Sequence, residues 1–124
     1  MKLTLEQIAA WALTTLSEAE RRRSVVYIEA RRRPAGESIP LGRRAVTRAA
    51  PTVVVFVDLE PAANWSHPCR YLLIDPDSDA RESIEGEFPP PRDHLRLVHR
   101  GSDVADWMLL TTVPLGTDDT GELS

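Results

Sequence analysis

Side chains that could do chemistry are concentrated in one short segment, residues 64–71 (NWSHPCRY). This segment holds the only asparagine and the only cysteine of the chain, with one of its three histidines and one of its three tryptophans. Cys69 offers a thiolate nucleophile, and His67 lies two residues away, where an extended backbone brings both side chains to one face. One interpretation is therefore a cysteine-dependent enzyme in which His67 is the base and Cys69 is the nucleophile.

The interpretation that we favour is a binding surface formed by the same segment. Aromatic and arginine side chains contribute much of the energy of protein interfaces, and loops held by a rigid sheet often carry function. The expected surface consists of Asn64, Trp65, His67, Arg70, Tyr71 and, from a proline-rich segment, Phe88. The sequence thus predicts a small non-enzymatic protein that binds another macromolecule, as an adaptor, an inhibitor, an immunity-type protein or an accessory protein. We expect its partner to be another protein.

The sequence predicts no metal site and no cofactor. Zinc takes about four ligands, or three and a water, whereas His67 and Cys69 supply two. His94, His99 or a carboxylate would have to complete such a site. The segment Asp75–Asp79 matches the first half of a calcium-binding loop, but the glycine and the glutamate required later in that loop are missing. Neither a glycine-rich phosphate loop nor a Gly-x-Ser-x-Gly motif occurs, which argues against nucleotide enzymes and common serine hydrolases.

Charge is divided unevenly along the chain. Residues 1–50 carry ten Lys and Arg against five Asp and Glu, while residues 51–124 carry five against fourteen. The triplets Arg21–Arg23 and Arg31–Arg33 would share one face of a continuous helix, which gives a second alternative, nucleic-acid binding through an arginine-rich N-terminal helix. The acidic half would repel phosphate, so nucleic acid is the less favoured partner.

The N-terminal residues predict helices. Thr4 and Gln7 form a capping-box pattern, and apolar residues recur at helical spacing from Leu5 to Leu16. Ser17 opens a second capping box, and we expect a second helix that ends before Pro34.

One stretch within the second helix leaves its structure open. Glu29 and Arg33 are spaced as a helical i,i+4 pair, which favours the helix. The β-branched and aromatic residues of Ser24–Ala30 instead favour a strand.

The rest of the chain predicts strands. These are Thr52–Asp58, Arg70–Asp75, Ala80–Glu85, Leu95–His99 and Asp106–Val113. The first is nearly continuous in apolar residues, which indicates a central strand covered on both faces. Asp75–Asp79 contains a proline and three aspartates, which predicts a hairpin turn.

Helices followed by strands predict an α+β fold, in which one or two N-terminal helices pack on an antiparallel sheet of four to five strands. A chain of 124 residues has room for one such domain, which we place at residues 1–115. The acidic residues 116–124 are expected to form a disordered tail.

Composition indicates the origin and compartment of the protein. One lysine against fourteen arginines indicates a GC-rich, bacterial genome, and the lone cysteine suits a reducing compartment. No apolar run approaches the ~20 residues of a membrane span, and the first residues lack an apolar signal core. We therefore expect a cytoplasmic protein without membrane contact, either a monomer or a homodimer paired through an edge strand.

Overall fold

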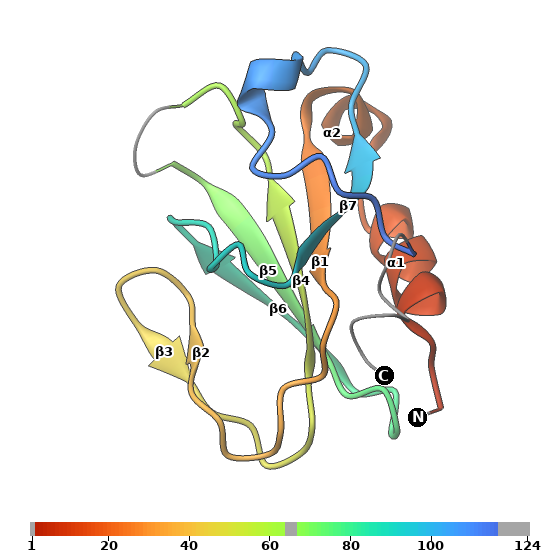
Figure 1. The fold of residues 1–124 in the computed structure, drawn as a ribbon, viewed down its shortest axis with the longest axis vertical. Helices are drawn as coiled ribbons and strands as arrows, with labels where there is room; N and C mark the ends of the chain where they lie inside the picture. The colour runs from red at the N-terminus through yellow and green to blue at the C-terminus, as the bar shows by residue number, and fades with distance from the viewer. Residues whose placement is uncertain (1, 64–66, 117–124) are drawn as a thin grey trace.

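The fold is built on one antiparallel sheet, seen in the computed structural model (Figure 1), which describes residues 2–63 and 67–116. Five strands lie in the order β6-β5-β4-β1-β7, and every neighbouring pair is antiparallel. The strands are β1 (Val25–Glu29), β4 (Val53–Asp58), β5 (Cys69–Ile74), β6 (Arg81–Gly86) and β7 (Leu95–Arg100). The other elements are α1 (Leu5–Thr14), α2 (Glu18–Arg23), a hairpin of β2 (Ile39–Pro40) and β3 (Ala45–Val46), and the 3₁₀ helix η1 (Asp106–Met108). The predicted α+β class is confirmed.

The middle strand, β4, is buried along its whole length. Its β-branched residues favour a strand, and their continuous apolarity requires a covering layer on each face of the sheet. Alternate residues belong to two separate cores: Val53, Val55 and Val57 to one, and Val54 and Phe56 to the other. The prediction of a central strand covered on both faces is confirmed.

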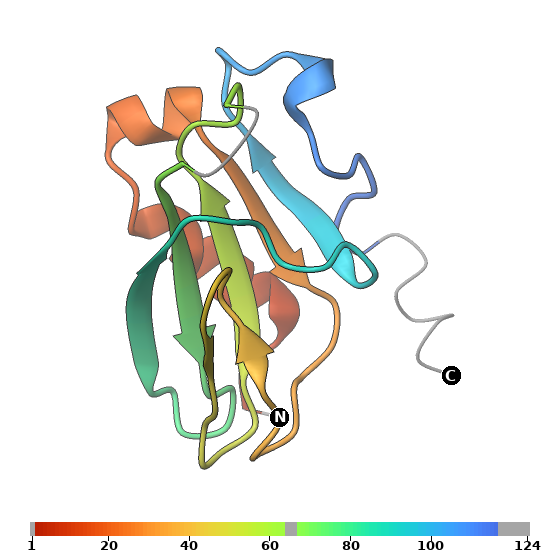
Figure 2. The same ribbon diagram turned by 90° about the vertical axis from the view of Figure 1, so that its left-hand side faces the viewer.

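The helix α1 covers one face of the sheet (Figure 2). A reciprocal capping box fixes its start: the Gln7 amide donates to the Thr4 hydroxyl at 3.0 Å, and the Thr4 amide donates to the Gln7 side chain at 2.9 Å. Ile8 and Ala12, one turn apart, are buried against the strands. The predicted first helix is confirmed, although it ends at Thr14 rather than at Leu16.

The opposite face is covered by the β2–β3 hairpin and by residues 104–110, which follow β7 (Figure 2). Beneath this layer, three aromatic rings from neighbouring strands lie in a row. The ring centroids of Tyr27 and Phe56 are 6.1 Å apart, and those of Phe56 and Tyr71 are 5.2 Å apart. Aromatic packing of this kind adds stabilisation beyond the area that the rings bury.

The second helix is much shorter than predicted, and Ser24–Ala30 is a strand. The helix α2 ends at Arg23, and β1 pairs with β4 on one side and β7 on the other. Because all five residues of β1 are buried, their packing between two strands outweighs the local charge spacing that favours a helix. Within the described residues, neither helix is both long and apolar enough to cross a membrane.

The predicted strand at Asp106–Val113 is wrong. This segment begins with η1, and its last residue, Val113, lies beside β7. The Leu97 amide donates to the Val113 carbonyl at 2.7 Å, and the Leu115 amide donates to the Leu97 carbonyl at 3.0 Å. The pairing is a single parallel bridge between Leu97 and Pro114.

The predicted hairpin turn between β5 and β6 is confirmed. Asp75 accepts hydrogen bonds from the Asp77 amide at 2.9 Å and from the Ser78 hydroxyl at 2.7 Å. Asp79 adopts a left-handed φ of 69°, a conformation that aspartate tolerates better than most residues.

A buried ion pair ties the end of β1 to the loop that leads into the hairpin. Arg33 donates from Nε and Nη2 to the two carboxylate oxygens of Glu29, each at 2.8 Å, and both side chains are buried. Its Nη1 donates to Glu37 at 3.0 Å. Backbone hydrogen bonds pair Arg33 with Thr52, directly before β4. The i,i+4 pair therefore bridges a strand end and does not lie along a helix.

We expect Arg33→Met to lower the free energy of unfolding by about 3–5 kcal/mol, because it leaves the Glu29 carboxylate buried without its partner. The double variant Glu29→Leu, Arg33→Met removes both charges, so its free energy of unfolding should fall far less. Urea unfolding followed by circular dichroism measures both losses. Equal losses in the single and double variants would show that the unpaired charge is not the cause.

Candidate functional site

The structure separates two of the residues that the sequence groups at positions 64–71, Arg70 and Tyr71. Asn64 and Trp65 lie outside the described residues. Arg70 and Tyr71 are consecutive in β5, so their side chains point to opposite faces of the sheet. The described members of the expected surface therefore do not form one patch.

Arg70 and Tyr71 both serve the fold. Arg70 pairs with Glu20 of α2 at 3.3 Å, which ties that helix to β5. Tyr71 is fully buried, and its hydroxyl donates to the Phe88 carbonyl at 2.5 Å. This hydrogen bond holds the connection between β6 and β7 against the sheet.

Cys69 lies in the core, with 1% of its surface exposed. Its thiol donates to the Phe88 carbonyl at 3.8 Å. Burial, followed by the nearby carboxylates of Asp58, Glu87 and Glu85, raises the pKa of the Cys69 thiol to about 12. A reactive cysteine needs the opposite environment, with a nearby cation and access to solvent. The geometry therefore gives no support to Cys69 as a nucleophile.

His67 is paired with Asp58, the last residue of the central strand. Its Nε2 lies 2.8 Å from Asp58 Oδ1, and the side chains are 11% and 6% exposed. The same Oδ1 accepts the Glu60 amide at 3.1 Å, which fixes the carboxylate in place. Burial raises the pKa of Asp58, and the hydrogen bond from His67 offsets part of that rise. The result is an imidazole held in one orientation by a buried acid.

His67 and Asp58 line a hollow of about 410 Å³, which we call the loop groove. It lies where the loops after β4 and β7 gather at one end of the sheet, and the β6–β7 connection crosses the sheet beside it (Figures 1 and 2). Its other lining residues are mostly apolar: Pro61, Ala63, Phe88, Pro89, Arg92, Trp107, Met108, Leu109 and Leu110. The loop groove thus combines apolar walls with an oriented imidazole and one arginine.

Trp107 is the most solvent-exposed large apolar residue in the described chain, at 68%. Hydrogen bonds fix the backbone on both sides of it: the Met108 amide donates to Ala105 at 3.0 Å, and the Leu110 amide donates to the Tyr27 hydroxyl at 2.9 Å. An ion pair between Arg100 and Asp106 adds a further tie. The indole is therefore presented to solvent from a well-anchored turn.

The sequence does not single out Trp107 or Arg92 as site residues. Trp107 falls in a segment predicted as a strand, and Arg92 follows three consecutive prolines. A signal for Trp107 was its rarity, since tryptophan occurs three times in the chain. Nothing in the sequence placed either residue beside His67.

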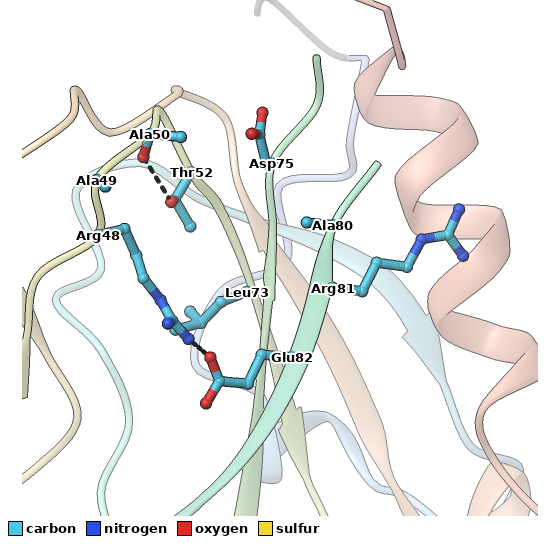
Figure 3. A pocket seen from close by; sticks show the side chains of 9 residues that line it. All are labelled: Arg48, Ala49, Ala50, Thr52, Leu73, Asp75, Ala80, Arg81 and Glu82. Carbon is cyan, nitrogen blue, oxygen red and sulfur yellow. Dashed lines mark hydrogen bonds and ion pairs between the residues drawn. The ribbon is translucent and has the colours of Figure 1, made fainter. Parts of the chain in front are cut away.

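A second hollow, of about 220 Å³, lies at the opposite end of the sheet (Figure 3). Arg48 and Glu82 form an ion pair across it, and the Thr52 hydroxyl donates to the Ala50 carbonyl at 3.1 Å. Arg81 turns away toward α1, where its guanidinium lies 4.4 Å from the centre of the Trp11 ring. Because Arg48 and Glu82 pair with each other and Arg81 points away, this hollow is the weaker candidate for a site.

No metal centre is evident in residues 2–63 and 67–116: these residues contain no group of three His, Cys, Asp or Glu side chains placed to hold an ion. What the loop groove can do chemically is bind an apolar segment and pair with an anionic group on it.

We expect the Cys69 thiol to resist iodoacetamide in the folded protein at pH 8. A pKa of about 12 leaves roughly one thiol in 10⁴ ionised, and the sulfur is covered. Labelling should therefore follow global unfolding in urea. A fast reaction in native buffer that disappears in His67→Ala would favour the cysteine-enzyme interpretation instead.

We expect the Asp58 carboxyl to titrate above its ordinary pKa of 3.8, and His67→Leu to raise that pKa further. Leucine keeps water out but removes the hydrogen bond that favours the carboxylate. Because the folded-state pKa is raised, stability is lost as pH rises through it, and the loss should be larger in His67→Leu. NMR of the carboxyl carbons measures the pKa. A value at or below 3.8 in the wild-type protein would contradict the effect of burial.

Comparisons of the chain with models of protein families, with curated proteins and with solved structures gave no significant match. The function therefore has to be argued from the site itself.

Proposed function

We propose that this protein binds a segment of another protein in the loop groove. The observation that carries the proposal is the exposed Trp107 at the edge of an apolar hollow. An indole buries about 150–250 Å² on contact, and tryptophan is among the residues that most often dominate binding energy. A single exposed apolar side chain is ordinary on a protein surface, but here it adjoins a concave apolar site.

The rigidity of the groove supports the proposal. The walls are held by backbone hydrogen bonds around Trp107 and by the Tyr71 hydroxyl on the Phe88 carbonyl. The walls also include Pro89, the first of three consecutive prolines, which stiffen the chain. A site that is already ordered loses little entropy on binding, which favours affinity.

This proposal keeps part of the surface expected from the sequence. His67 and Phe88 line the loop groove, whereas Arg70 and Tyr71 belong to the fold. The participation of Asn64 and Trp65 stays a prediction. The centre of the proposed surface moves to Trp107, some forty residues further along the chain.

Nucleic-acid binding receives less support. The strand β1 separates the two arginine triplets, so they do not share a helix face. Several of these arginines already face carboxylates: Arg22 faces Glu18, Arg31 and Arg33 face Glu37, and Arg32 faces Asp77. Phosphate contacts require arginines that are free to replace counterions. A cytoplasmic, bacterial setting remains part of the proposal, on the strength of the composition.

We expect Trp107→Ser to weaken binding of a defined peptide ligand at least about thirtyfold, the loss typical of a tryptophan at the centre of an interface. The ligands are peptides selected from a random display library on the wild-type protein, and their affinity is measured by fluorescence anisotropy. Val113→Ser is the matched control, since Val113 is the other exposed large apolar residue of the described chain, at 39%, and lies outside the loop groove.

Two results would contradict the proposed function. One is that the library yields no peptide that binds the folded protein. The other is that the selected peptides bind Trp107→Ser and wild type equally well.

A further inference from the structure

Arg92 is a cation of the loop groove that no carboxylate of the described residues pairs with. Among residues 2–63 and 67–116, no carboxylate lies within ion-pair distance of its guanidinium. The groove's one carboxylate, Asp58, is already engaged with the His67 ring. The charge of Arg92 is therefore available to a ligand.

The backbone of Arg92 is held in place although its side chain is exposed. Its carbonyl accepts the Leu95 amide at 3.1 Å, at the start of β7. Three prolines precede it, and the middle one, Pro90, is buried. A stiff backbone presents the guanidinium to the groove from a fixed point.

Apolar side chains line the same hollow as this cation. Phe88 and Pro89 come from the same connection as Arg92, and Trp107 and Met108 come from η1. An ion pair that a ligand covers on several sides is shielded from water and from salt, which strengthens it relative to a fully exposed pair. Arginine also offers a planar fork that matches the two oxygens of a carboxylate.

We infer that the partner segment carries an aspartate or glutamate side chain that pairs with Arg92, next to an apolar residue that packs on Trp107. This inference rests on the proposed function and adds the chemical class of the ligand. The protein has a net charge of −4, so long-range attraction does not bring an acidic segment to the groove. The carboxylate instead selects among apolar segments once they are in contact.

The test uses amidated synthetic peptides taken from the library selection on the wild-type protein. Amidation removes the terminal carboxylate, so only side-chain acids remain. We expect the selected sequences to share an acidic residue beside an aromatic or aliphatic one. Replacing that acid by its amide should weaken binding to the wild-type protein about tenfold or more.

Charge exchange identifies the partner of that acid. Arg92→Gln should bind the acidic peptide more weakly than the wild-type protein by the same factor. It should bind the amide peptide as tightly as the wild-type protein does. Arg92→Glu should regain affinity when the acid of the peptide is replaced by lysine. Arg32→Gln is the matched control, because Arg32 lies outside the loop groove and its loss removes the same charge.

The outcomes separate the two claims. Peptides that need Trp107 but bind equally well with acid or amide would overturn the inference and leave the proposed function standing. The inference would also be overturned if replacing the acid by its amide weakened binding equally in the wild-type protein and in Arg92→Gln, since another group would then bind the carboxylate. A library that yields no binding peptide overturns both claims.

Discussion

The structure depends on one constraint, the burial of β4 on both of its faces. Both faces of β4 carry apolar side chains that would otherwise meet water, so a layer must cover the sheet on either side. The helix α1 supplies one layer. The β2–β3 hairpin and residues 104–110 supply the other, and the Glu29–Arg33 ion pair holds the loop that leads into the hairpin.

This burial also explains where the candidate site lies. The apolar run of β4 ends in Asp58, and the chain must there change from core to solvent. A carboxylate at that boundary needs a hydrogen-bonding partner, which His67 provides from the returning loop. Residues 104–110, which follow β7, reach the same end of the sheet, and Trp107 lines the hollow that His67 and Asp58 also line. The position of the site therefore follows from the burial of β4.

The sequence predicts what local patterns encode. The capping box at Thr4, the aspartate turn at Asp75 and the apolar run of β4 each carry their signal within a few residues. The sequence does not predict the structure where contacts between residues far apart in the chain determine it. β1 is a strand because β4 and β7 flank it, although Glu29 and Arg33 have helical spacing. The sequence pairs His67 with Cys69, two residues away, whereas in the fold His67 pairs with Asp58, nine residues away.

The central claim is that ligands occupy the loop groove, and NMR mapping tests it most directly. A peptide selected on the wild-type protein is titrated into ¹⁵N-labelled protein. We expect the Trp107 indole signal and the amides of residues 62–63 and 107–110 to shift, while the amides of residues 48–50, 52 and 80–82 stay unchanged. Shifts confined to the amides of residues 48–50, 52 and 80–82, at the opposite end of the sheet, would contradict the claim.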